Sequence, residues 1–127
     1  MSHWVISLLI GALAGCTGFS GSNVPARFES DRDVPRLVDL ARLSLYTYDR
    51  DRRNAGQSAC SGDCVKEWPP LLAGADAKPA GDFRLITRED GRRQWTYKGR
   101  PLHRYAGDRA PGEITGDGQA NLWRLAR

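Results

Sequence analysis

The sequence contains no catalytic motif that identifies a reaction, and it has only two histidines and three cysteines among 127 residues. Its one apolar run, Trp4–Leu13, holds about ten residues, whereas a membrane-spanning helix needs roughly twenty. No Cys-x-x-Cys pair is present. Arg residues are interleaved with Asp and Glu, so the formal charge of +4 does not indicate a nucleic-acid partner. These absences argue against a permanent membrane span, a thioredoxin-like protein and a nucleic-acid-binding protein.

The apolar run is typical of the hydrophobic region of a secretory signal. Small residues stand directly before Cys16, which resembles the lipobox of bacterial lipoproteins, where the signal is removed and the cysteine becomes the lipidated N-terminus. We therefore expect a signal peptide at residues 1–15 and lipidation at Cys16. A buried N-terminal helix with an incidental cysteine is the alternative, and the absence of Lys or Arg ahead of the run departs from the signal pattern.

The lipobox resemblance also implies a location. Thr17 follows Cys16, in place of the Asp that retains some lipoproteins at the inner membrane, which implies the outer membrane of a bacterial envelope, facing the periplasm. Residues 16–33 are rich in Gly, Ser, Asn and Pro and predict a flexible tether. Residues 34–127 then form one domain's worth of chain. We expect this domain to hold two repeats, at about 37–72 and 83–125.

The repeat is visible as a segment that recurs at a constant offset of 57 residues. Residues 45–52, LYTYDRDR, match residues 102–109, LHRYAGDR, with Leu, Tyr, Asp and Arg in step. Self-similarity of this kind indicates one small supersecondary unit used twice. The shared pattern is aromatic-x-aromatic-x-x-Asp, formed by Tyr46, Tyr48 and Asp51 in the first copy and by His103, Tyr105 and Asp108 in the second.

The second copy has the pattern of an antiparallel meander. Residues 83–87 and 94–97 are β-prone, and Lys98-Gly99 then predicts a tight turn before an alternating segment at 100–105. Residues 122–125 predict a last strand that closes the domain.

The first copy predicts the matching hairpin, with strands at 37–40 and 43–48. A helix over Pro35–Leu45 also fits the leucine spacing, and the match to the second copy favours the strands. Residues 63–68 predict a single helical turn capped by Asp63. The expected fold is mainly β: two pseudo-repeated antiparallel hairpin or meander units packed as one small domain, with a short helical turn near the cysteine pair.

The motif side chains have a packing interpretation and a binding one. Alternation places Tyr46 and Tyr48 on one face of their strand and His103 and Tyr105 on the equivalent face, with Leu45 and its counterpart pointing the other way. Packing in the core is favoured, with Trp68 and Trp123 as structural aromatic anchors. The alternative is a groove between the copies lined by these aromatic side chains.

The motif aspartates, Asp51 and Asp108, lie just past the ends of the strands. An Asp at such a place commonly caps backbone N–H groups in a turn. Hydrolysis by the two carboxyls is a weaker hypothesis, because a glycosidase requires them about 5–10 Å apart across a cleft. Nothing in the sequence brings the two together.

Cys60 and Cys64 remain as an even pair once Cys16 is assigned to lipid, which favours a disulfide in an oxidising compartment. The alternative is a metal-, haem- or thiol-redox site that uses both cysteines and His103. Residues 107–119 are rich in Gly and Asp but lack the ligand spacing of a calcium loop. We expect no bound metal and no cofactor.

The paired motif, the lipobox, and Gly62-Asp63-Cys64 followed by residues 68–72, WPPLL, together resemble one family. It comprises predicted bacterial lipoproteins with a Tyr-x-(Phe/Trp/Tyr)-x-x-Asp motif, described as a secreted repeat of unknown function. The resemblance covers roughly Leu37–Leu125 and implies no activity; His103 departs from the motif. We expect a lipid-anchored envelope protein that is a binding or structural module and not an enzyme. Its expected partners are the membrane, through the anchor, and a small ligand, a glycan or an envelope protein, with no nucleic acid.

Overall fold

The computed structural model describes residues 11, 24–31 and 33–127. The expected signal peptide apart from Gly11, the expected lipidation site Cys16 and the expected tether up to residue 23 lie outside the described residues. Within the described part of the chain, no helix is long and apolar enough to cross a bilayer.

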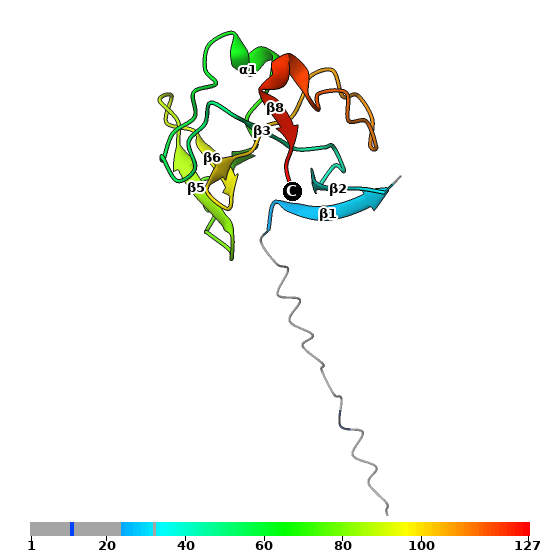
Figure 1. The fold of residues 1–127 in the computed structure, drawn as a ribbon. Helices are drawn as coiled ribbons and strands as arrows, with labels where there is room; N and C mark the ends of the chain where they lie inside the picture. The colour runs from blue at the N-terminus through cyan, green and yellow to red at the C-terminus, as the bar shows by residue number, and fades with distance from the viewer. Residues whose placement is uncertain (1–10, 12–23, 32) are drawn as a thin grey trace, which may run out of the picture.

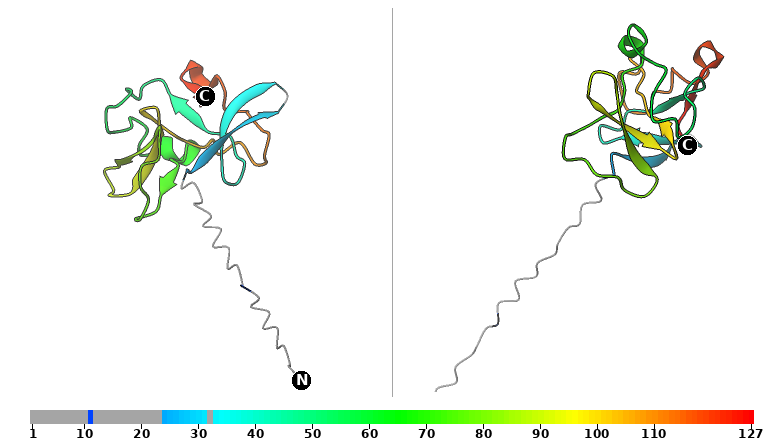
Figure 2. Two further views of the ribbon diagram at one scale, coloured as in Figure 1. Left: turned by 90° about the horizontal axis from the view of Figure 1, so that it is seen from below. Right: turned by 90° about the vertical axis from the view of Figure 1, so that its left-hand side faces the viewer.

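The described residues form a mainly β domain (Figure 1). Its strands pair antiparallel in three sheets, β1 with β2, β3 with β8, and β4, β6, β5 and β7 together. In Figures 1 and 2 the β1–β2 and β5–β6 hairpins lie on opposite sides, with β3 and β8 between them. The elements are β1 (Ala26–Asp31), β2 (Val34–Asp39), β3 (Tyr46–Tyr48), α1 (Cys64–Glu67), β4 (Leu72–Ala73), β5 (Phe83–Thr87), β6 (Arg93–Tyr97), β7 (Arg100–Pro101), the 3-10 helix η1 (Gln119–Asn121) and β8 (Trp123–Leu125).

Strand β1 corrects the expected tether, which ends before Ala26 and not at residue 33. The strand pairs with β2 along its whole length, from Ala26 opposite Asp39 to Asp31 opposite Val34. The sequence of β1 gives little strand signal, because half of its side chains are exposed and only Ala26 is buried, while β2 supplies most of the buried side chains of the hairpin. The β1–β2 hairpin of the first copy is the counterpart of the β5–β6 hairpin of the second.

Matching backbone bonds define the two copies, which we call copy 1 (residues 26–72) and copy 2 (residues 83–127). In copy 1 the N–H of Leu45 bonds the carbonyl of Leu37 at 3.0 Å, and in copy 2 the N–H of Leu102 bonds the carbonyl of Trp95 at 3.0 Å. Leu37 lies in β2, so the helix considered for Pro35–Leu45 is not formed. Arg42 has φ 64 and makes the turn that Lys98 and Gly99, with φ 49 and 81, make in copy 2.

The side chains pack in two cores on the two faces of the central strands. Leu45 and Leu102, both 0% exposed, belong to one core together with Leu37 and Trp95. Tyr46, whose side chain points the other way, belongs to the second core with the residues Cys60, Trp68, Trp123 and Leu125. The change of core between neighbouring residues follows the two-residue period of a strand.

The helical turn α1 follows the cysteine loop, and η1 lies near it at the end of the domain opposite the start of β1 (Figures 1 and 2). Asp63 stands at the N-cap of α1, but its side chain makes no capping bond and pairs with Lys66 at 3.0 Å instead. The predicted Asp63 cap is therefore wrong. The ion pair with Lys66, three residues further along the chain, engages the Asp63 carboxylate that would otherwise cap the helix.

Candidate functional site

Tyr46 and His103, the equivalent residues of the two motifs, pair with each other. The N–H of Tyr46 bonds the carbonyl of His103 at 2.8 Å, and the N–H of His103 bonds the carbonyl of Tyr46 at 3.0 Å. Equivalent residues can exchange both bonds only across a twofold relation between their copies. The remaining motif contacts also come in matched pairs, of which some join the two copies and others lie within one copy.

Tyr46 of copy 1 holds the loop of copy 2. Its hydroxyl donates to Asp108 Oδ2 at 2.5 Å and accepts the N–H of Gly116 at 3.2 Å. Asp108 Oδ1 accepts the N–H of Thr115 at 2.9 Å and its hydroxyl at 2.6 Å. Burial, and next the hydrogen bond to Asp108, raise the pKa of Tyr46, so the phenol stays neutral. Tyr46 thus closes the loop of residues 109–118, which we call the Gly loop.

Asp51 of copy 1 holds the loop of its own copy, residues 52–62, which we call the Cys loop. Its Oδ1 accepts the N–H of Ala59 at 2.6 Å, and its Oδ2 accepts the hydroxyl of Ser58 at 2.8 Å. His103 Nε2 of copy 2 lies 3.5 Å from the same hydroxyl oxygen. Burial raises the pKa of Asp51, and the bonds from Ala59 and Ser58 oppose that shift. Because imidazole is shorter than phenol, Ser58 stands between His103 and Asp51.

His103 is a neutral imidazole in the core. Arg88 donates to Gln94 Oε1 at 2.7 Å, which orients the Gln94 amide nitrogen towards His103 Nε2, at 3.3 Å. Nε2 can accept from this amide when the ring proton is on Nδ1, and in that tautomer it only contacts Ser58, whose hydroxyl donates to Asp51. Burial, and next the positive charge of Arg88, lower the pKa of His103 to about 3. An imidazole held in this way is a packing and hydrogen-bonding group at neutral pH.

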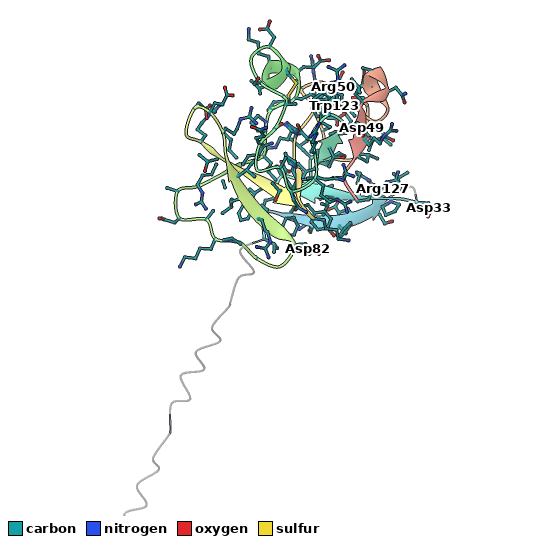
Figure 3. The ribbon with its side chains drawn as sticks, turned by 60° about the vertical axis from the view of Figure 1, so that its left-hand side comes forward. Asp33, Asp49, Arg50, Asp82, Trp123 and Arg127 are labelled. Atoms are coloured by element: carbon teal, nitrogen blue, oxygen red, sulfur yellow. A yellow bond between two sulfur atoms is a disulfide. The ribbon has the colours of Figure 1, made fainter. Side chains whose placement is uncertain are left out.

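Four aromatic rings stack over the twofold relation, and we call them the ring stack. Trp68 and Trp123 lie at its centre with ring centroids 3.9 Å apart and planes 3° from parallel. Tyr105 of copy 2 stacks on Trp68 at 4.4 Å, and Tyr48 of copy 1 stacks on Trp123 at 4.3 Å. Figure 3 labels Trp123 in the part of the domain where β8 runs. Each outer ring therefore packs on the tryptophan of the other copy.

The comparisons with known proteins agree with this duplicated geometry. The sequence model of a family described as "Secreted repeat of unknown function" matches residues 30–72 and 84–127, one match for each copy. The chain belongs to this family. No curated protein and no solved structure matches the chain significantly. In the structure the secreted repeat reaches further towards the N-terminus than the family match, because β1 begins at Ala26.

The cysteine pair of this secreted repeat is a disulfide, as the cysteine count predicted. Cys60 and Cys64 are joined with an S–S distance of 2.04 Å and Cα atoms 5.3 Å apart. The alternative metal-, haem- or thiol-redox site with His103 is wrong, because both sulfurs are bonded to each other and His103 faces Gln94. Among the described residues no group of three or more His, Cys, Asp or Glu side chains could hold a metal ion.

The predicted aromatic groove is also wrong. Tyr46 and His103 are 0% exposed, and the remaining two rings of that set, Tyr48 and Tyr105, are half-buried in the ring stack. Asp51 and Asp108 are 3% and 7% exposed and are each bonded within a different loop, so the two carboxyls do not flank a cleft as hydrolysis requires.

Sequence reasoning missed Ser58 and Thr115, the hydroxyl residues that link each motif aspartate to its loop. Both stand seven positions after their aspartate, at the same offset of 57 residues as the motif itself. The repeat therefore carried the signal that could have identified them. Gln94 and Arg88 gave no such signal, because their counterparts in copy 1 differ in chemistry.

A cleft of about 360 Å³ opens between the Cys loop and the turn that joins β5 to β6. One wall carries the side chains of Ser58 and Ser61 with Val65 of α1, and the other carries Arg88 and Arg92. Arg88 also donates to the carbonyl of Cys60 at 2.6 Å and so ties the two walls together. The cleft lies where the copies differ most, beside the disulfide of copy 1.

Proposed function

We propose that this secreted repeat is a lipid-anchored, non-enzymatic binding module of the bacterial cell envelope, held at the outer membrane facing the periplasm. The observation that carries the proposal is that both sets of motif side chains are consumed by the fold. Tyr46 with Asp108 and His103 with Ser58 are buried or bonded between the copies, which leaves no motif group to attack a substrate. The family description as secreted supports export.

The cleft beside the Cys loop is the binding place of the proposed module. It offers hydroxyl and guanidinium donors, the carboxylates of Glu89 and Asp90, and a single large apolar side chain, Val65. Such a lining suits a small polar ligand with several hydroxyl groups, of which a sugar is the simplest case. The disulfide and the Arg88–Cys60 bond fix the walls before binding, which lowers the entropy cost of association.

Nuclear magnetic resonance titration of the full chain with a panel of mono- and disaccharides tests the binding role. We expect saturable amide shifts confined to the Cys loop and the β5–β6 turn for one sugar class. Arg92→Ala is expected to weaken that binding about tenfold by removing a donor from the wall, whereas Arg124→Ala, outside the cleft, is the matched control. Shifts centred elsewhere, or none with any sugar, contradict this ligand class and place.

Metabolic labelling with an alkyne fatty acid in a Gram-negative host tests the anchor. We expect the wild-type chain to carry the label and to fractionate with the outer membrane. Cys16→Ala is expected to lose the label, while the double variant Cys60→Ala and Cys64→Ala keeps it because those sulfurs are not the acylation site. Label on the Cys16→Ala chain, or none on the wild type, contradicts the anchor.

A further inference from the structure

The twofold relation gives the domain two grooves at equivalent places. In copy 1 the groove holds Asp39, Leu40 and Leu71, and in copy 2 the residues at the same strand positions are Tyr97, Lys98 and Ala126. The equivalence follows from the backbone hydrogen bonds. The N–H of Leu71 bonds the carbonyl of Leu102, and the N–H of Ala126 bonds the carbonyl of Leu45, the residue of copy 1 that matches Leu102. We call the first the apolar groove, after its exposed leucines, and the second the cationic groove. Two acidic and two basic side chains also line the apolar groove, so its formal charge is zero.

The cationic groove concentrates the charge of the chain. Five of the chain's 19 Lys and Arg side chains line it, against one of its 15 acidic side chains, Asp49. The groove therefore carries a formal charge of +4, equal to that of the whole chain, and the remaining side chains sum to zero. Its cationic side chains are Arg53, Lys98, Arg100, Arg124 and Arg127.

Most of these cations have no acidic partner. Arg124 pairs with Asp49 at 3.0 Å, whereas none of the other four is in an ion pair with a described residue. The Lys98 ammonium lies 5.3 Å from the centroid of the Tyr97 ring, and both residues line the groove. Uncompensated like charges gathered in a groove of about 350 Å³ create a positive potential that attracts anions.

The cationic groove reaches the half of the domain where the chain enters it. Figure 3 labels Asp82 and Arg127 in the half that contains the start of β1, and Arg50 and Trp123 in the other half. Lys98 lies beside Asp82, since its N–H bonds the Asp82 carbonyl at 3.0 Å. The apolar groove reaches the same half, because Val24 and Pro25, which precede β1, line it.

The distance to the proposed anchor is short. Eight residues separate Val24 from Cys16, and an extended chain covers up to ~3.5 Å per residue, so the domain stays within about 28 Å of a lipid attached at Cys16. Leu40 of the apolar groove is 76% exposed and Leu72 is 41% exposed. The positive potential of the cationic groove and the short reach of the proposed anchor favour anionic lipid headgroups over a soluble polyanion, and the exposed leucines of the apolar groove suit the apolar part of a lipid surface.

We propose that the cationic groove docks the domain on anionic lipid headgroups, with the guanidinium and ammonium groups binding headgroup phosphates. This docking rests on the proposed lipid anchor for its place in the cell. The headgroup chemistry itself is a property of the folded domain and can be measured without the anchor.

Vesicle co-sedimentation of the full chain carrying Cys16→Ser tests the docking. Vesicles of phosphatidylglycerol mixed with phosphatidylcholine are compared with vesicles of phosphatidylcholine alone. The N-terminal apolar run and the amino group ahead of it are the same in every variant, so they contribute equally to the groove and control variants. We expect tighter binding to the anionic vesicles and a loss of that preference in high salt, because surface charge is screened within ~10 Å at moderate salt.

The double variant Lys98→Gln and Arg100→Gln removes two cations from the groove. Each cation near an anionic surface raises the partition coefficient about fivefold, so we expect the partition coefficient of the double variant onto the anionic vesicles to fall at least ~10-fold. The control, Lys66→Gln with Arg109→Gln, removes the same charge from exposed sites outside the groove and is expected to lose less than ~3-fold. Near-ultraviolet circular dichroism of the ring stack verifies that both variants are folded.

Three results overturn the docking: equal binding to both kinds of vesicle, equal losses in the groove and control variants, or groove-dependent binding of soluble polyphosphate with no binding to vesicles. Acylation of Cys16 is read separately by the metabolic label. An unlabelled Cys16 with groove-dependent vesicle binding defeats the anchor and leaves the headgroup site, whereas a labelled Cys16 without vesicle preference does the reverse.

Discussion

Copy 1 and copy 2 each extend one side chain towards the loop of the other, and the two side chains differ. Tyr46 reaches Asp108 directly, at 2.5 Å, whereas His103 stops short of Asp51 and meets Ser58 at 3.5 Å. The backbone pairing between Tyr46 and His103 is the same in both directions. The difference teaches that the connection between the copies is retained while the group that makes it changes.

The loops show the same division. The Gly loop is held by Tyr46, Asp108 and Thr115, and the Cys loop carries in addition the Cys60–Cys64 bridge. The weaker side-chain contact between the copies, through His103, is therefore made to the loop that is also closed by a disulfide. The repeat is therefore a scaffold made twice, and the binding chemistry that we propose resides in the surfaces where the copies diverge.

Breaking the ring stack is expected to have the largest effect. Trp123→Ala removes a ring that stacks on Trp68 at 3.9 Å and on Tyr48 at 4.3 Å, and truncation of a buried aromatic costs about 3–5 kcal/mol. Trp68→Ala is expected to cost a similar amount, because the twofold relation gives it equivalent neighbours. Urea denaturation measures both. A cost below ~1 kcal/mol for either contradicts the central place of the stack.

Acid is expected to weaken the fold through His103. Its folded pKa, about 3, lies below the ordinary value of 6.5, so the unfolded chain binds a proton first and the stability that the neutral ring provides is lost as pH falls. The loss approaches about 1.4 kcal/mol per pH unit below pH 6.5, or roughly 3 kcal/mol between pH 6 and 4. The raised pKa of Asp51 acts in the opposite direction.

The pH experiment needs a variant that cannot titrate at this position. Urea denaturation gives the free energy of unfolding of the wild type and of His103→Gln at each pH from 4 to 7. The difference between the two slopes of this free energy against pH isolates the contribution of the histidine. Equal slopes refute a neutral buried His103. The other copy gives the reverse case: burial raises the pKa of Tyr46, so its contribution is retained in acid and lost in alkali.

Tyr46→Phe sharpens the comparison at one atom. It removes the hydroxyl that donates to Asp108 Oδ2 and leaves a carboxylate, 7% exposed, with one donor fewer. Loss of a partner to a buried charged group costs about 1–3 kcal/mol. Ser58→Ala removes the hydroxyl that donates to Asp51 in copy 1 and is expected to cost less, because Ser58 is half-buried and water can replace its hydroxyl, whereas Tyr46 is 0% exposed. Denaturation midpoints of the two variants decide the order, and a larger cost for Ser58→Ala contradicts it.

Reduction of the Cys60–Cys64 bridge is expected to have a small effect, no larger than that of Tyr46→Phe. A loop of so few residues restricts the unfolded chain by only about 2 kcal/mol in the chain-entropy treatment. Thermal denaturation with and without reductant measures the change. Complete unfolding on reduction contradicts the prediction, because copy 2 keeps its loop by hydrogen bonds alone.

The fold class and the disulfide could be predicted because they depend on local signals. Turn residues such as Gly99, strand alternation and the cysteine spacing each act within a few residues of chain. Strand β1 could not, since its side chains are largely polar and its partner strand carries the buried groups. The pairing of Tyr46 with His103 is likewise a contact between copies, which neither copy's own pattern specifies.

The site was harder to predict than the fold. Strand alternation correctly placed the side chains of Tyr46 and Leu45 on opposite faces of their strand. It does not determine whether the aromatic face is exposed to solvent or packed against the second copy. The structure shows that the twofold relation buries that face, so the predicted aromatic groove is filled by the ring stack. The five cations of the cationic groove come from three separate segments of the chain, so no contiguous charge run was there to detect.

Amide hydrogen exchange on Tyr46→Phe tests most directly the claim that each copy holds the loop of the other. After correction for the global loss of stability, we predict that the amides of Thr115 and Gly116 in copy 2 exchange at least ~10-fold faster, because their acceptors Asp108 and Tyr46 lose their link. The amide of Ala59 in copy 1 is predicted to keep its protection, since it bonds Asp51. Faster exchange at Ala59 with no change at Thr115 and Gly116 would contradict the account.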